Sequence, residues 1–130
     1  MQTMTDMVMD FHKLYNAYIS EKPELRDKDI AKLRIKLLDE ELNEYKEAVY
    51  TNNLVEIADA LGDIIYVAIG AAISYGIPME KVFAEIHRSN MDKLDENGNP
   101  IINEYGKVVK PSWWQPPDLK TILIEHGANI

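Results

Sequence analysis

Residues 60–73, with the sequence ALGDIIYVAIGAAI, contain a single side chain that is charged at neutral pH, Asp63. A helix that is apolar on nearly every face has to be buried. Its uninterrupted apolar part, residues 64–73, has ten residues, which is half of the ~20 that cross a bilayer. We therefore expect a core helix of a soluble protein. Its one carboxylate needs a partner or a metal ion, because burying an unpaired charge is costly.

Helical spacing of apolar residues extends over most of the chain. Gly76 is expected to cap the core helix, and Pro78 suits the first turn of the helix that follows it. Short connections between long helices favour antiparallel neighbours, so the helical body is predicted to resemble a four-helix bundle. The expected helices cover about residues 3–20, 29–50, 54–75 and 78–93.

The C-terminal third has a different character. Turn signals at Asn97-Gly98 and Tyr105-Gly106 predict a short β-hairpin or extended arm. A short final helix is expected after the two prolines that follow, and no internal repeat is recognised. We predict one all-α domain over residues 1–130, with a helical core over about 3–93 and a C-terminal arm over about 94–130.

Composition excludes several classes of function. The net charge of −8 and the sequence pI of about 4.8 argue against binding nucleic acid through phosphate contacts alone. The chain has no cysteine, which excludes disulfides, zinc–thiolate sites and cysteine nucleophiles. Its first residues lack the pattern of a signal peptide. We therefore expect a cytoplasmic protein without a membrane partner.

Acidic residues form stripes on two successive predicted helices. Asp59 lies one turn before Asp63 and Glu56 lies one turn before Asp59, so the three share one face. The preceding helix carries Glu40, Glu41 and Glu44 at matching spacings. On adjacent antiparallel helices these stripes would form an oxygen-rich pocket, which hard cations such as Mg²⁺ or Mn²⁺ prefer. The predicted ligand is a metal-chelated polyphosphate, with Asp39 and Glu47 as solvated charges.

A di-iron or di-manganese oxidase would also be an all-helical metalloprotein. Such bundles use Glu-x-x-His pairs. None of the three histidines, His12, His87 and His126, has a glutamate three residues before it, so the redox interpretation is not supported.

The sequence resembles the all-α nucleoside triphosphate pyrophosphohydrolases, which include the MazG-type enzymes. The resemblance rests on EELNE at 40–44 and DALGDIIY at 59–66, which are similar to the family signature E-E-x-x-E, a spacer and E-x-x-D. EIHRSNMDKL at 85–94, NGNPIINEYGKVVKP at 97–111 and PPDL at 116–119 are similar to a MazG-like, phosphoribosyl-ATP pyrophosphohydrolase-like subgroup. The resemblance covers about residues 27–120.

One position departs from the signature. If Asp63 is the signature aspartate, Ala60 stands where the second glutamate is expected. Asp59 could replace that glutamate. Alternatively, the pair in use is Glu56 and Asp59, which does have E-x-x-D spacing. Both alternatives stay open at this point.

The resemblance implies a Mg²⁺-dependent hydrolase that converts a nucleoside triphosphate to its monophosphate and pyrophosphate, with nucleotide-pool housecleaning as the role. Mn²⁺ is a possible substitute ion. The implied catalytic residues are Glu40, Glu41, Glu44 and Asp63, with Glu40 as the base that activates water. The implied metal ligands are Glu41, Glu44, Asp63, Asp59 and Glu56, and the implied substrate-binding residues are Arg88, Asn90 and Lys93.

Members of this group build their sites in dimers or tetramers, so the resemblance also implies a homodimer or a higher homo-oligomer. Two functions other than hydrolysis of a nucleoside triphosphate are also compatible with the sequence. One is hydrolysis of phosphoribosyl-ATP, and the other is a non-catalytic helical binding or assembly protein, which the alanine at position 60 favours. Trp113 and Trp114 are expected to anchor the C-terminal segment rather than to stack on a base.

Overall fold

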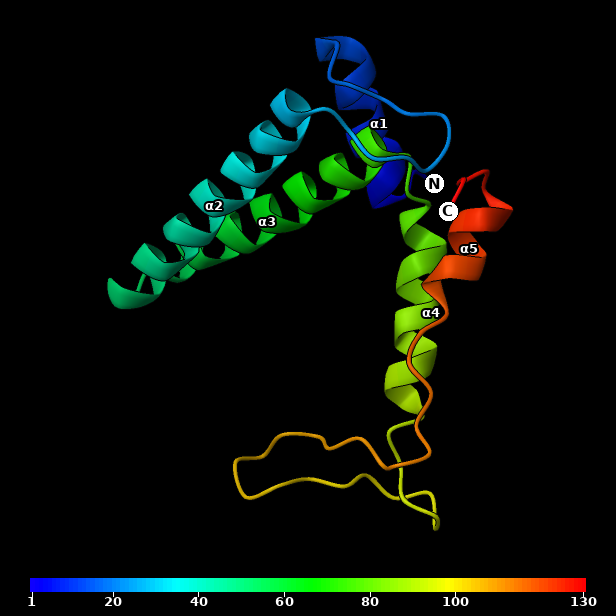
Figure 1. Cartoon of the computed structure of the whole chain (residues 1–130). Coiled ribbons are helices and arrows are strands. Elements are labelled where there is room, and N and C mark those ends of the chain that lie inside the picture. The colour runs from blue at the N-terminus through cyan, green and yellow to red at the C-terminus, as the bar shows by residue number, and fades with distance from the viewer.

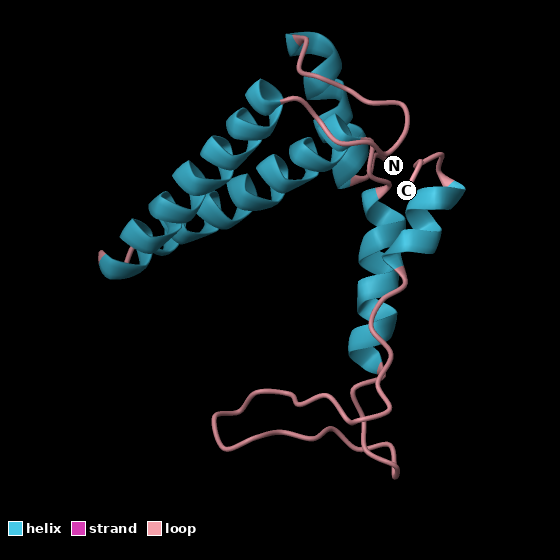
Figure 2. Ribbon diagram, viewed as in Figure 1, coloured by secondary structure: helices cyan, strands magenta, loops and turns pink.

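The computed structural model describes residues 1–130 and contains five helices and no sheet (Figure 1 and Figure 2). The predicted all-α class is confirmed. The first helix ends at Tyr15 instead of near residue 20, because Asn16 takes a left-handed conformation with φ of 58°. The helices are α1 (Met4–Tyr15), α2 (Lys28–Tyr50), α3 (Leu54–Tyr75), α4 (Met79–Met91) and α5 (Leu119–Glu125).

α2 and α3 form a long antiparallel pair, which Figure 1 shows as the largest helical unit of the chain. Asp27 caps α2 by accepting a hydrogen bond from the Ile30 N–H at 2.9 Å. Asn53 caps α3 in the same way, from the Glu56 N–H at 3.1 Å. Only residues 51–53 lie between the two helices. A connection this short forces the helices to lie side by side.

α1 packs across the C-terminal half of α3. The core between them consists of Val8 from α1 with Ile69 and Ile73 from α3. The chain returns along α3 after α1, where the Ser74 hydroxyl donates to the Tyr18 carbonyl at 3.0 Å. α3 therefore packs against both α2 and α1.

The predicted four-helix bundle is wrong for the single chain, because α4 stands away from α2 and α3 and packs against α5 (Figure 1). α3 ends at Gly76, whose φ of 71° belongs to the left-handed region, and Pro78 then starts α4 in a new direction. The carboxylate of Glu85 accepts a hydrogen bond from the Asp118 N–H at 2.7 Å. This contact holds the start of α5 on α4.

The predicted β-hairpin is also wrong, since residues 94–118 form no strands. Two isolated bridges join Leu94 with Pro100 and Ile102 with Val108. In both loops one side chain closes the turn: Asp95 Oδ1 accepts from two backbone N–H groups, and Asn103 Oδ1 does the same eight residues later. Each turn satisfies its own backbone groups, which leaves two consecutive copies of one loop instead of a paired sheet.

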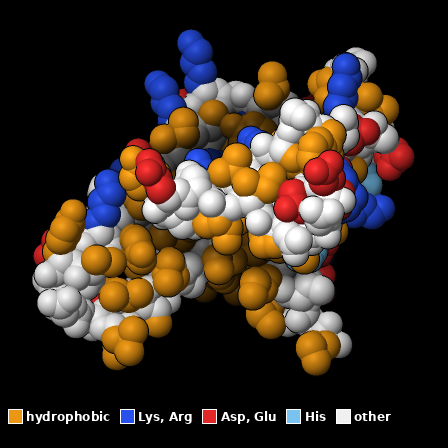
Figure 3. Space-filling model, turned by 90° about the horizontal axis from the view of Figure 1, so that it is seen from below, with side chains coloured by type: hydrophobic (Ala, Val, Ile, Leu, Met, Phe, Trp, Pro, Cys, Tyr) orange, Lys and Arg blue, Asp and Glu red, His pale blue; other side chains and the backbone are white.

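Many large apolar side chains are exposed in the single chain. Figure 3 shows them spread over the face seen from below. On α3 they include Leu61, Ile65 and Tyr66, at 45%, 48% and 40% exposure. By length and composition α3 would be long enough to cross a membrane, a property that it shares with core helices of soluble proteins, and 33% of its most apolar window is buried in this chain.

Candidate metal centre

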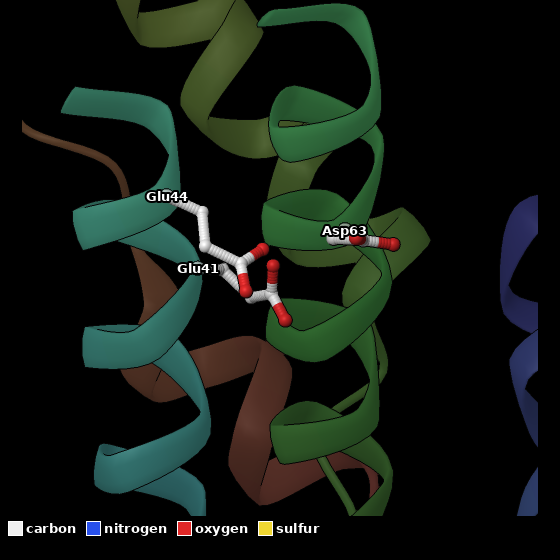
Figure 4. A group of neighbouring side chains, drawn as sticks. All are labelled: Glu41, Glu44 and Asp63. Carbon is white, nitrogen blue, oxygen red and sulfur yellow. The ribbon is translucent and has the colours of Figure 1, made fainter. Parts of the chain in front are cut away.

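Three carboxylates from α2 and α3 come together in the middle of the helix pair. Glu41 and Glu44 extend from α2, and Asp63 extends from α3 (Figure 4). One oxygen atom from each residue lies within 4.8 Å of the other two. No Lys or Arg forms an ion pair with any of the three. The sequence placed these residues on facing stripes, and the structure brings them into one group.

Glu41 is the most perturbed member of the group. Burial raises its pKa to about 7, with smaller contributions from the neighbouring carboxylates of Glu44, Asp63 and Asp59. Burial also raises the pKa of Asp63, followed by the charges of Asp59 and Glu44. The Oε2 atom of Glu41 is buried and has no hydrogen-bond partner. An oxygen atom taken out of water without a partner is costly, and a bound cation would remove that cost.

The donor set fits a hard divalent cation. All of the converging atoms are carboxylate oxygens, which are the ligands that Mg²⁺ and Mn²⁺ prefer. The group leaves room for water and phosphate oxygens on the cation, since only three side chains converge. Within the chain, the orphaned Oε2 of Glu41 is the observation that fits a metal best.

An acidic cleft of about 390 Å³ extends from the group toward the turn between α2 and α3. Glu44 belongs to both the carboxylate group and the cleft. Ala60, at the position where the family signature has glutamate, is 2% exposed and lies at the cleft. The lining residues are Glu44, Glu47, Ala48, Thr51, Glu56, Asp59 and Ala60. Asp59 and Glu56, the two alternatives for the missing glutamate, thus both face the cleft.

Glu40 is not part of the carboxylate group. It is exposed, and its Oε1 lies 4.0 Å from Lys36 Nζ in a surface ion pair. Such exposed pairs contribute little to stability. The structure therefore places the predicted base beside Glu41 in the sequence but on the solvent side of α2.

The predicted phosphate-binding residues lie at the end of α4, and one chain does not bring them to the carboxylates (Figure 1). Arg88 is already engaged, with Nε 2.6 Å from Glu85 and Nη1 2.8 Å from Asp92. Lys93 Nζ lies 5.3 Å from the centre of the Trp114 ring. Asn90 is exposed.

Two buried polar residues beside Gly70 of α3 were not recognised from the sequence. Arg34 is 8% exposed and His12 is 2% exposed. Arg34 lies four residues after Ile30 and four before Leu38, both members of the apolar stripe of α2. A basic residue within such a stripe is the signal that would have identified it.

Comparison with known proteins gives two matches. Residues 8–90 match the family model described as phosphoribosyl-ATP pyrophosphohydrolase. An uncharacterised protein of Acanthamoeba polyphaga mimivirus is 37% identical over 79 residues, which cover 61% of this chain and 29% of that protein. The chain thus spans less than a third of the length of this viral relative. The family match covers α2 and α3, residues 8–15 of α1 and all but the last residue of α4, and so includes every residue of the carboxylate group.

Proposed function

The chain belongs to the phosphoribosyl-ATP pyrophosphohydrolase family, part of the MazG-like all-α nucleoside triphosphate pyrophosphohydrolase superfamily, and on that premise we propose that it hydrolyses a nucleoside triphosphate. The proposed products are the nucleoside monophosphate and pyrophosphate. The proposed cofactor is Mg²⁺, with Mn²⁺ as a substitute, and the proposed role is control of the nucleotide pool.

The observation that carries this proposal is the group of three carboxylates with its buried, unpartnered Glu41 oxygen. The family generally uses a divalent metal. A chain with a net charge of −8 repels a triphosphate at long range, and a cation held between them would offset that repulsion. A divalent ion held there would offset the charge of the triphosphate, polarise phosphorus and activate water.

The residues of this chain have distinct proposed roles. Glu41, Glu44 and Asp63 hold the cation through their converging oxygens. Asp59 takes the place of the expected glutamate, because its charge contributes to the raised pKa of both Glu41 and Asp63, whereas the charge of Glu56 contributes to neither. Glu40 remains the proposed base because it directly precedes Glu41 on α2, and its carboxylate lies in an exposed ion pair with Lys36 that costs little to break.

Phosphoribosyl-ATP is the second candidate substrate. The description of the matching family favours it. The HRSNMDK and PPDL segments favour the nucleoside triphosphate, because they resemble the MazG-like subgroup. Both substrates require cleavage between the α- and β-phosphorus atoms, so the same carboxylate group serves either reaction.

We also propose that the working form is a homodimer or a higher homo-oligomer. Two observations support it. Large apolar side chains of α1 and α3 are exposed in the single chain, and together these helices line an apolar groove of about 150 Å³. In addition, Asn90 and Lys93 lie away from the carboxylates of their own chain. Association of copies would cover the apolar surface.

The proposal is tested by incubating the protein with a panel of dNTPs, NTPs and phosphoribosyl-ATP, and quantifying nucleotide and pyrophosphate products by chromatography. Each substrate is assayed with Mg²⁺, with Mn²⁺ and with EDTA. We expect metal-dependent release of pyrophosphate from at least one member of the panel. If no substrate is cleaved and EDTA leaves the melting temperature unchanged, the non-catalytic alternative replaces the enzyme.

A further inference from the structure

Arg34 is a buried cation that the metal centre does not use directly. It is 8% exposed, forms no ion pair, and leaves its Nε buried without a hydrogen-bond partner. Burying an arginine in this way costs free energy. Its Nη2 donates to the Val67 carbonyl at 3.1 Å, which anchors the side chain of an α2 residue on the backbone of α3.

Gly70 makes room for this arrangement. A Cβ atom at position 70 would lie 2.2 Å from Nη2 of Arg34 and 3.1 Å from Nε2 of His12. The guanidinium therefore lies directly against the α3 backbone, where any other residue would push it away. His12 closes the contact from the side of α1, and its Nδ1 lies 3.1 Å from the Tyr18 carbonyl.

The Arg34–Gly70 contact and the carboxylate group lie on the same seam between α2 and α3. Arg34 is seven residues before Glu41, and Gly70 is seven residues after Asp63. Seven residues are close to two helical turns, so each helix presents both positions on one side. Because the helices are antiparallel, the two contacts are two turns apart, or about 10 Å. At the opposite end of the helix pair, the turn at residues 51–53 connects α2 to α3.

We propose that Arg34 is a positioning residue of the metal centre, whose contact with Gly70 fixes the separation and rotation at which α2 and α3 bring Glu41 to Asp63. This inference rests on the proposed metal-binding function of the group. The turn at residues 51–53 fixes only one end of the helix pair. At the other end, an apolar residue in place of Arg34 would fill space without a directional anchor on α3. The planar guanidinium supplies that anchor.

A direct electrostatic role does not explain the arginine. At about 10 Å from the carboxylates its charge is too distant to act as a counter-ion for the group. Arg34 is also absent from the charges that act on Glu41 or Asp63. Its effect on the centre therefore passes through the geometry of the helices.

The test measures Mn²⁺ binding to the whole chain by titration calorimetry and by electron paramagnetic resonance of free Mn²⁺. Arg34→Met keeps an unbranched apolar stem and removes the guanidinium that anchors α2 on the Val67 carbonyl, and Gly70→Ala displaces the native arginine. We expect each variant to bind Mn²⁺ about 10- to 100-fold more weakly, as when groups that orient metal ligands are removed. Arg34→Met and Gly70→Ala break the same contact, so their effects should not add. The double variant should bind Mn²⁺ no more weakly than the single variant with the lower Mn²⁺ affinity.

Val8→Ala is the control for loss of stability alone. Val8 belongs to the core between α1 and α3 and is part of neither the carboxylate group nor the Arg34–Gly70 contact. We expect the melting temperature of Val8→Ala to fall while its Mn²⁺ affinity stays within about two-fold of the wild type, since the change removes no metal ligand and leaves the anchor of Arg34 in place. If Arg34 contributed only to stability, Arg34→Met would likewise lower the melting temperature and leave the Mn²⁺ affinity unchanged.

Mn²⁺ binding to the wild type and to the variants separates failure of the metal centre from failure of the positioning role. If the wild-type chain binds no Mn²⁺, the proposed metal centre itself fails. If the wild type binds Mn²⁺ and folded Arg34→Met binds it equally well, only the positioning role fails. Should Arg34→Met not fold, Gly70→Ala decides, and wild-type Mn²⁺ affinity in that variant overturns the inference.

Discussion

Glu41 makes the stability of the metal-free protein depend on pH. Burial and the neighbouring carboxylates raise its pKa to about 7, so the folded state holds this proton more tightly than the unfolded state does. For an acid with a raised pKa, the free energy of unfolding falls as pH rises from about 4.5 to about 7. The raised pKa of Asp63 acts in the same direction.

We therefore predict that Glu41→Gln raises the melting temperature of the metal-free protein at pH 8 and changes it little at pH 4.5. Mg²⁺ should stabilise the wild type more at pH 8 than at pH 5.5, and should not stabilise the variant. Differential scanning fluorimetry across this range measures both effects. His12, whose pKa is lowered by burial, destabilises the fold at acid pH in both proteins and cancels in the difference. A parallel pH profile for the two proteins would contradict the prediction.

The carboxylates themselves are tested by isosteric amides. Glu44→Gln and Asp63→Asn keep the size of the side chain and remove the charge that holds the cation. We predict that each lowers turnover by at least about 100-fold, comparable to the loss of an electrostatic group that stabilises a transition state. Circular dichroism should show folded protein in each case.

Asp39→Asn is the matched control for this experiment, because Asp39 is an exposed acid on the same helix and should keep full activity. Glu40→Gln tests the proposed base and should lower kcat without weakening Mn²⁺ binding. Full activity in Asp63→Asn would show that the metal constellation is wrong.

At the scale of the elements, local signals were sufficient for α2 and α3, whereas the first helix was predicted about five residues too long. The glycine cap at Gly76 and the apolar periodicity placed α3 at about residues 54–75, as the structure has it. The facing carboxylates followed from the same periodicity, since the pairing of adjacent helices is set by a short turn. The location of α4 could not be predicted, because the direction of a chain after a glycine–proline connection depends on tertiary contacts that no local pattern contains.

The arm shows a second limit of the sequence. Its Gly98 and Gly106 turns were recognised, but a hairpin was expected because β-prone residues follow each of them. In the structure Asp95 and Asn103 hydrogen-bond the backbone within their own turns. Aspartate and asparagine compete with strand pairing in this way, and the eight-residue repetition of the motif was missed.

Trp114 holds the arm against α4. Its Nε1 donates to the Ser89 carbonyl at 2.6 Å, and Lys110 Nζ lies 4.8 Å from its ring centre. We predict that Trp114→Phe, which loses only the hydrogen bond and part of the ring, weakens the arm by about 0.5–1.5 kcal/mol. Amide hydrogen exchange should then be about 2- to 10-fold faster over residues 94–118. Trp113 is 56% exposed, so Trp113→Phe is the matched control, and equal acceleration in both variants would refute the anchoring role.

At the scale of the whole molecule, the chain presents its proposed site in two separated parts. The carboxylates lie between α2 and α3, whereas Asn90 and Lys93 lie at the end of α4 (Figure 1). The proposed homo-oligomer explains both this separation and the exposed apolar surface, if α4 of one copy reaches the carboxylates of another. Each site would then need residues from two chains.

This arrangement predicts complementation between inactive variants. Glu44→Gln removes the metal-binding part of the site and Lys93→Ala removes a phosphate-binding part, so each protein alone should have little activity. After the two are unfolded, mixed in equal amounts and refolded together, half of the mixed dimers' sites carry both changes and the other half carry none. Random pairing puts half of the molecules into mixed dimers, so recovery should approach about one quarter of wild-type activity. Light scattering should report a dimer or larger species for every sample, and activity no greater than the sum of the separate variants would show that each chain builds its site alone.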